Sequence, residues 1–182
     1  MERKKLSLSW IILLGSIPMF LLGSLNHFLY NLLGKNIIIG LFVAVNESVW
    51  EHMKLVILPM VLWWAVSYFF IRKTREIDIN KWFTSGLVSI IVALLIIPFL
   101  FYFYTSAFGI KLVPIDISIF FIAVFLGQLI AIHFYKYSKG INWFIIFCVF
   151  LIIILIFMLS TLYPPKLPIF KDSVTENYGI YK

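Results

Sequence analysis

The chain has 182 residues, of which 63% are hydrophobic and only 13% charged, and its formal net charge is +7. A soluble domain is about half apolar and about one quarter charged, so this composition excludes an ordinary soluble protein and predicts one that lives in a lipid bilayer. The positive charge does not indicate nucleic acid as a partner, because Lys and Arg stand at the ends of apolar segments, where they fix the orientation of membrane helices.

Five apolar segments are long enough to cross a bilayer, and we expect all five to be α-helices. About 20 apolar residues span the hydrocarbon core as a helix, whereas open strands cannot satisfy their backbone hydrogen bonds in lipid. The first segment follows a basic N-terminus without a small-residue cleavage site, so it is interpreted as an uncleaved helix. The expected spans are 8–33, 46–71, 82–104, 114–135 and 141–162.

Basic residues predict a cytoplasmic N-terminus and an outer C-terminal tail. With the N-terminus inside, nine Lys and Arg residues lie in the cytoplasmic tail and connections, against three in the outer connections, which is a positive-inside bias. The nine are Arg3, Lys4, Lys5, Arg72, Lys73, Arg75, Lys81, Lys136 and Lys139, and the three are Lys35, Lys54 and Lys111. The fold prediction is therefore an all-α integral membrane protein with five spans.

Two segments are expected to lie at the outer surface without crossing the membrane. The apolar part of residues 34–45 is too short to span, so it predicts a re-entrant or interfacial segment that leads the chain to Asn46. The tail, residues 164–182, places apolar residues between three prolines, as in YPPKLPIF, which favours a docked segment. We expect it to fold over the outer end of the bundle, residues 1–163, as a lid, with a loosely held interfacial tail as the alternative.

The stretch NESVWEHMK, residues 46–54, concentrates polar side chains in an apolar chain. Asn46 is expected to be the N-cap of the second span, with Glu47 in its first turn facing the positive end of the helix dipole. Glu47 and Glu51 would then share one helix face four residues apart, where they need a cation or a shared proton. Ser48 and His52 would lie on the neighbouring face.

Side chains from other spans reach the same level of the membrane and predict a metal site. His27 lies near the outer end of the first span and Asp116 at the outer start of the fourth. The predicted ligands of a zinc ion are His27, His52 and one carboxylate from Asp116 or Glu51. The single cysteine excludes a cysteine-based metal cluster.

A zinc ion at this place would suit hydrolysis of a lipid or another amphipathic substrate. Glu51 or Glu47 would act as the general base, and Ser48 would assist by hydrogen bonding. The spacing Ser48-x-x-x-His52 resembles one motif of the membrane hydrolase superfamily that contains alkaline ceramidases. The chain departs from that superfamily because it has five predicted spans instead of seven and lacks paired histidines on a final helix.

Three other interpretations of the polar residues stay open. They could form a structural network of hydrogen bonds between helices. They could serve an ion or solute transporter, in which Glu47 and Glu51 bind a cation and Gln128 lines the path. The chain could also be a non-catalytic partner or sensor subunit, whose outer tail binds another protein.

The segments SLNHFLYNLLGKN, GLFVAVNESVWEHMKL and YPPKLPIFKDSVTENYGI together resemble a family of small multi-pass bacterial membrane proteins of unknown function. The resemblance covers nearly the whole chain. It implies a location in the bacterial plasma membrane, and it brings no activity, substrate or ligand, so the site residues above rest on the residues alone.

Overall fold

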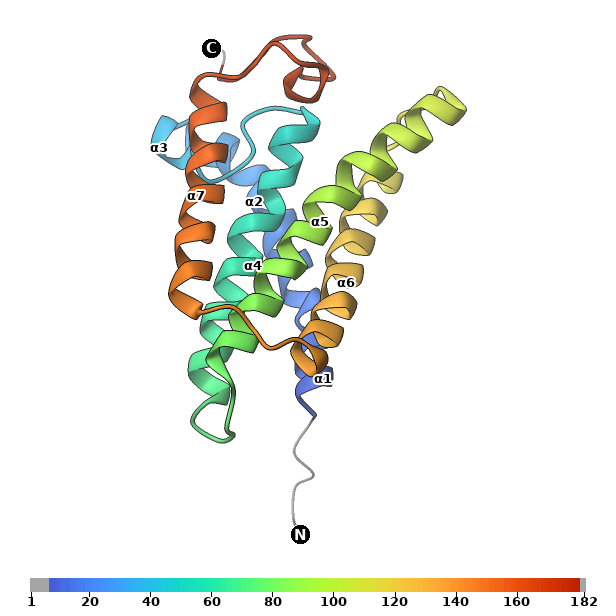
Figure 1. Cartoon of the computed structure of the whole chain (residues 1–182). Coiled ribbons are helices and arrows are strands. Elements are labelled where there is room, and N and C mark those ends of the chain that lie inside the picture. Colours follow the sequence, from blue (N-terminus) through green and yellow to red (C-terminus); the bar gives the residue numbers. More distant parts are fainter. Residues whose placement is uncertain (1–6, 181–182) are drawn as a thin grey trace.

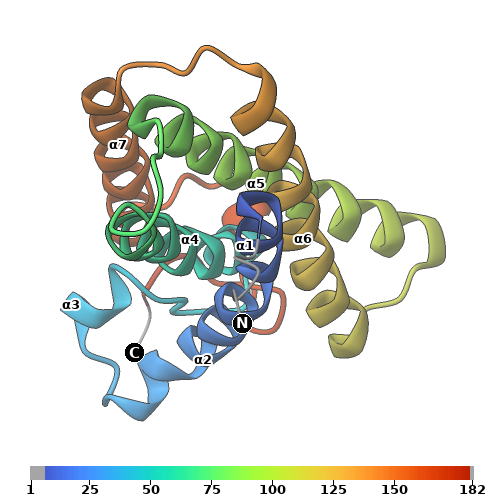
Figure 2. The same ribbon diagram turned by 90° about the horizontal axis from the view of Figure 1, so that it is seen from below.

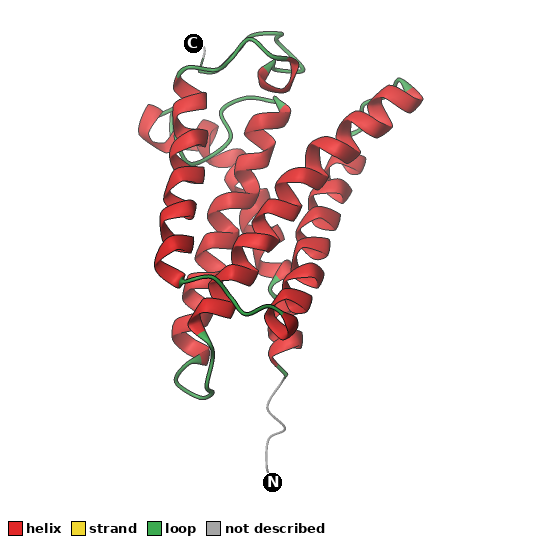
Figure 3. Ribbon diagram, viewed as in Figure 1, coloured by secondary structure: helices red, strands yellow, loops and turns green. Residues whose placement is uncertain are grey.

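A computed structural model describes residues 7–180, and in this part of the chain every regular element is a helix (Figures 1 and 3). The C-terminal segment also contains one isolated antiparallel β-bridge, between Lys171 and Tyr178. In chain order the elements are α1 (Leu8–Leu14), α2 (Ser16–Leu32), α3 (Ile37–Gly40), α4 (Val49–Ile71), α5 (Ile79–Phe108), α6 (Val113–Tyr137), α7 (Trp143–Leu162) and the 3₁₀-helix η1 (Pro168–Phe170).

Five of these helical segments are long and apolar enough to cross a membrane, which confirms the predicted all-α architecture with five spans. Helices α1 and α2 form the first span together, Leu8–Leu32, and α4 to α7 are the other four. The second span begins at Val49, three residues after the predicted Asn46. Arg3, Lys4 and Lys5 lie outside the described residues, and the orientation across the membrane stays a prediction.

Helix α4 lies at the centre of the bundle (Figure 2). Half of its apolar stretch is buried inside the molecule, against 22–33% for the other four spans. It packs against α2, α5 and α7, whereas α6 packs against α5, α1 and α2. A helix enclosed on several sides needs apolar residues all round, which explains the nearly continuous run VILPMVLWWAV in α4.

Two glycines let the helices approach closely. A Cβ atom at Gly23 of α2 would come within 2.7 Å of the carbonyl oxygen of Leu55 in α4 and would also collide with the Phe120 ring of α6. A Cβ atom at Gly127 of α6 would lie 2.6 Å from the carbonyl oxygen of Ser89 in α5. Because packing rather than the hydrophobic effect holds helices together in lipid, these contacts set the distance of α2 from α4 and of α6 from α5.

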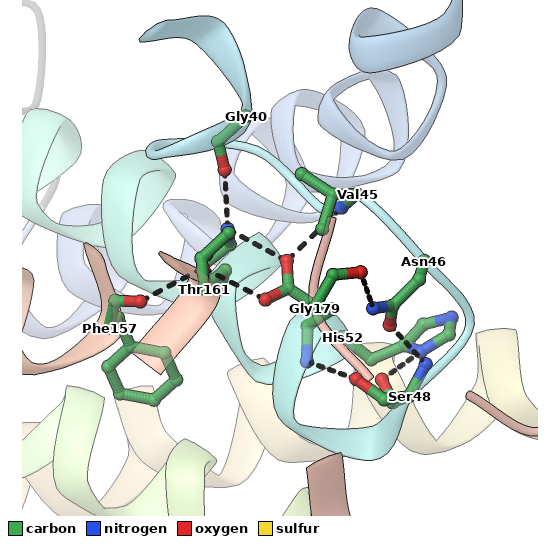
Figure 4. A network of polar contacts seen from close by, with 10 residues as sticks. Gly40, Val45, Asn46, Ser48, His52, Phe157, Thr161 and Gly179 are labelled. Atoms are coloured by element: carbon green, nitrogen blue, oxygen red, sulfur yellow. Dashed lines mark hydrogen bonds and ion pairs between the residues drawn. The ribbon is translucent and has the colours of Figure 1, made fainter. Parts of the chain in front are cut away.

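A buried ion pair at the start of α4 connects four segments of the chain (Figure 4). Lys54 Nζ lies 2.7 Å from Glu51 Oε2, and the two side chains are only 2% and 3% exposed. Lys54 also donates to the carbonyl oxygen of Gly40 at 2.7 Å, and Glu51 accepts from Thr161 Oγ1 at 2.9 Å and from the Val45 amide at 3.1 Å. The cation expected beside Glu51 is therefore Lys54, which lies buried in α4 and not in an outer connection.

Residues 163–180 pack across the same end of the bundle as this ion pair. We call it the site end, formed by residues 34–48, the start of α4, the end of α5 and the start of α6. Phe170 is buried with its ring centroid 4.5 Å from that of Trp50, and Asn46 Nδ2 donates to the carbonyl oxygen of Gly179 at 3.0 Å. The tail thus contacts the residues before and after Glu47 in the chain, and its role as a lid stays a prediction.

We expect Lys54→Met to destabilise the bundle strongly, because it leaves the Glu51 carboxylate buried without a counter-charge. Removal of one partner of a buried pair costs about 3–5 kcal/mol, whereas apolar replacement of both partners is often nearly neutral. The double variant Lys54→Met/Glu51→Leu should therefore regain most of the loss, as thermal unfolding in a mild detergent would measure.

The matched control is Lys171→Met, which removes the exposed ion pair with Glu176, whose two side chains are 39% and 78% exposed. An exposed pair contributes at most about 1 kcal/mol. If Lys54→Met lowered the unfolding temperature no more than this control, the Glu51–Lys54 pair would not stabilise the bundle.

Candidate metal centre

The backbone before α4 sets the position of Glu47. Ser48 is the N-cap of α4, because its Oγ accepts a hydrogen bond from the Glu51 amide at 3.2 Å. Asn46 Oδ1 accepts a hydrogen bond from the Ser48 amide at 2.9 Å, so the Asn46 side chain closes a turn just before the helix begins. The prediction that Asn46 caps the helix with Glu47 in its first turn is wrong, and Glu47 and Glu51 do not share a helix face.

Three side chains from separate segments meet at the site end. His27 comes from α2, His52 from the first turns of α4, and Glu47 from the loop before α4. His27 Nε2 lies 3.5 Å from Glu47 Oε1, and His52 Nε2 lies 3.4 Å from Glu47 Oε2. Each residue offers one ligand atom, and these atoms all lie within 4.8 Å of one another. The structure thus groups His27 and His52 with Glu47 rather than with Asp116 or Glu51.

The backbone of Ser48 determines which nitrogen of His52 faces Glu47. His52 Nδ1 lies 2.8 Å from the Ser48 carbonyl oxygen, which can only accept, so Nδ1 carries a proton and donates. In the neutral imidazole, Nε2 then presents a lone pair to the Glu47 carboxylate. Two lone pairs that face each other repel, so either a second proton on the imidazole or a metal ion must lie between Nε2 and the carboxylate, and the geometry leaves a place for a cation. Proteins orient metal-binding histidines in the same way, by a hydrogen bond from the other ring nitrogen to a carbonyl oxygen.

Glu47 is available as a ligand at neutral pH. Hydrogen bonding to the His52 side chain is the main influence on the carboxyl group, and it holds the pKa of Glu47 below the ordinary value although partial burial acts in the opposite direction. The side chain is 44% exposed, unlike that of Glu51. Glu47 therefore stays ionised and can be reached from outside the bundle.

Asp116 stands next to this group but has another partner. It lies in the first turn of α6, where Tyr104 of α5 donates to its Oδ1 with an Oη–Oδ1 distance of 2.6 Å. It is close enough to His52 to interact with the ring electrostatically. Asp116 is not one of the three residues whose ligand atoms converge, and its second carboxylate oxygen can act separately.

The other two predicted catalytic residues are engaged elsewhere. The Ser48 hydroxyl caps α4, and Glu51 is held by Lys54 and Thr161. The sequence Ser48-x-x-Glu51 has the spacing of a capping box, a signal for the true helix start that the sequence analysis did not use.

Asn26, which the sequence analysis did not single out, adjoins the metal-ligand candidate His27. Its side chain is buried with 8% of the residue exposed, and its Nδ2 has no hydrogen-bond partner among residues 7–180. The buried Nδ1 of His27 is also without a partner in that range. An amide inside an apolar span is costly to insert, which is the signal that could have identified it. Both nitrogen atoms offer unused hydrogen-bonding capacity beside the candidate site.

Comparisons with known proteins confirm one part of the resemblance, an uncharacterised family that covers nearly the whole chain. No curated protein and no solved structure matches the chain. A family model does match, over residues 1–180, and its description is a family of unknown function (DUF6512). The match covers nearly all of the chain and carries no activity, substrate or cellular location. The protein therefore belongs to the DUF6512 family, whose function is unknown.

Proposed function

We propose that this membrane protein binds a divalent transition-metal ion, zinc in the first place, between His27, Glu47 and His52, and uses it to hydrolyse an amphipathic substrate. The observation that carries the proposal is the pair of distances between the imidazoles and the carboxylate, 3.5 Å and 3.4 Å. They exceed the length of a charge-assisted hydrogen bond, about 2.7–2.9 Å. The two distances end on different carboxylate oxygens, and one donor atom from each residue lies within 4.8 Å of the other two. Small side-chain movements would bring these atoms to the separation of about 3.4 Å that ligands have around tetrahedral zinc.

The chemistry of the donor set also favours zinc. Two imidazoles and one carboxylate, with a fourth position left for water, are the pattern of catalytic zinc sites. Calcium and magnesium prefer oxygen ligands alone, so they fit less well. Non-haem iron(II) is held by the same three ligand types, which is why a metal analysis should cover both elements.

A zinc ion held by His27, Glu47 and His52 would supply the chemistry for hydrolysis, because it makes a water molecule acidic enough to lose a proton near neutral pH. In this proposal Glu47 is a ligand and Asp116 is the general base, because its Oδ1 is held by Tyr104 while the other oxygen remains to take the proton. Asp116 would take the proton of the attacking water molecule and return it to the leaving alcohol, whose bond to the acyl or phosphoryl centre would break as the water oxygen bonds there. The sequence analysis had assigned these two carboxylates the opposite roles.

The charge distribution supports a site at the outer surface of the plasma membrane. The loops opposite the site end carry Arg72, Lys73, Arg75 and Lys139, together with Lys81 and Lys136 at helix ends nearby. Positive residues of this kind mark the cytoplasmic side. The family resemblance adds the bacterial plasma membrane to the proposal.

The three alternatives have less support. A structural network exists around Glu51, Lys54 and Thr161, and His52 is bonded to the Ser48 carbonyl, but neither accounts for the approach of both imidazoles to Glu47. For transport, Gln128 is fully buried and accepts a hydrogen bond from Ser89 at 2.9 Å, so it is packed into the protein rather than lining a path. For a partner subunit, the tail makes its contacts with its own bundle.

The first test is elemental analysis of protein purified in mild detergent without chelator. We expect about one zinc ion per chain in the wild type and loss of the metal in His27→Ala and His52→Ala, since each removes one of three ligands. His133→Ala is the matched control, because His133 lies exposed in α6 near the opposite end of the bundle. Wild-type protein that is folded and free of zinc and iron would refute the metal site.

The second test separates binding from chemistry. Asp116→Asn should keep the metal and lose at least about 100-fold in hydrolysis of short-chain lipid esters, the contribution of a general base. Tyr104→Phe, which removes the hydrogen bond to Asp116 and the weaker one from the Leu112 amide but leaves the Asp116 carboxylate in place, should lose less. Equal rates in Asp116→Asn and the wild type would exclude Asp116 as the base.

A further inference from the structure

We infer that the substrate is a membrane lipid with an anionic phosphate head group, bound in a pocket that shares Glu47 with the candidate metal centre. The pocket has a volume of about 220 Å³ and lies between α5, the start of α4 and the C-terminal segment. This is smaller than the roughly 300–1,000 Å³ that encloses a whole drug-sized ligand, so it suits a head group alone. The inference rests on the proposed function and deepens it.

One uncompensated positive charge decides which head group fits. Lys111, in the connection between α5 and α6, lines the pocket and has no ion-pair partner within residues 7–180. The second cation of the lining, Lys171, is paired with Glu176 at 3.1 Å. Of the remaining acids, Asp172 is buried and accepts from the Val174 amide and the Thr175 hydroxyl, and Glu47 would bind the metal. Lys111 and the metal are then the two charges that a phosphate can neutralise.

The walls of the pocket suit an amphipathic molecule at the membrane boundary. On one side α5 contributes Phe101, Tyr102 and Thr105, and on the other the C-terminal segment contributes Pro168 and residues 171–173. On α5, the neighbouring Phe99 and Phe103 are 67% and 60% exposed and stack on each other, as lipid-facing residues of a spanning helix would. Acyl chains can follow this apolar face into the bilayer while the phosphate stays in the pocket beside Glu47.

The test is a calorimetric titration of the full chain in detergent with dihexanoyl phosphatidic acid, dihexanoyl phosphatidylcholine and inorganic phosphate. We expect the anionic lipid to bind at least tenfold more tightly than the zwitterionic one and more tightly than phosphate alone. Lys111→Gln should weaken binding of the anionic lipid about five- to tenfold, as expected for one charge-assisted contact. Lys166→Gln, an exposed lysine of the same C-terminal segment outside the pocket, should change nothing.

Equal affinity for the two lipids, no binding of either, or equal effects of Lys111→Gln and Lys166→Gln would overturn the inference. If inorganic phosphate bound as tightly as the anionic lipid, the pocket would be a site for free phosphate and not for a lipid head group. Metal content is measured in the same samples, so the two proposals fail separately. Protein that holds zinc without selectivity for the anionic lipid contradicts only the head-group site, whereas selective binding by protein that holds no metal contradicts only the metal centre.

Discussion

The ion pair between Lys54 and Glu51 is the interaction on which the geometry of the site end depends. Two charges buried in an apolar bundle are stable only when they are paired and fully hydrogen-bonded. Here the remaining hydrogen bonds come from Gly40, Val45 and Thr161, so the pair fastens the loop after α3 and the end of α7 to the first turn of α4. The loop that carries Glu47 is thereby held over α2 and α4.

This arrangement gives two nearby glutamates different environments. Glu51 is buried and neutralised by a lysine, so it contributes to the architecture. Glu47 is partly exposed and lies between two imidazoles, one of which is oriented by a backbone carbonyl. The first carboxylate has its charge satisfied within the protein, whereas the second keeps an ionised group next to two nitrogen ligands. An ionised carboxylate beside two imidazole nitrogens suits the binding of a cation that is not part of the chain.

The position of the candidate metal centre in the fold suits the binding of an amphipathic molecule. The three ligand candidates come from α2, the loop before α4 and the first turns of α4. The C-terminal segment passes over the end of the bundle at which α4 begins (Figure 1). Glu47 belongs both to this group and to the pocket beside α5. A ligand in the pocket would therefore meet polar groups at the membrane boundary and the apolar face of α5 below it.

The sequence by itself determined the five helices, because runs of about 20 apolar residues have no other stable form in a bilayer. It also singled out His27, His52 and Glu47, since ionisable residues are rare in such segments. Only the tertiary structure decided which carboxylate joins the histidines. Glu47 lies in a loop whose path depends on Asn46 with Gly179 and Glu51 with Thr161, pairs separated by 133 and 110 residues. Helical periodicity describes neighbours along one helix and cannot predict contacts between segments so distant in the chain.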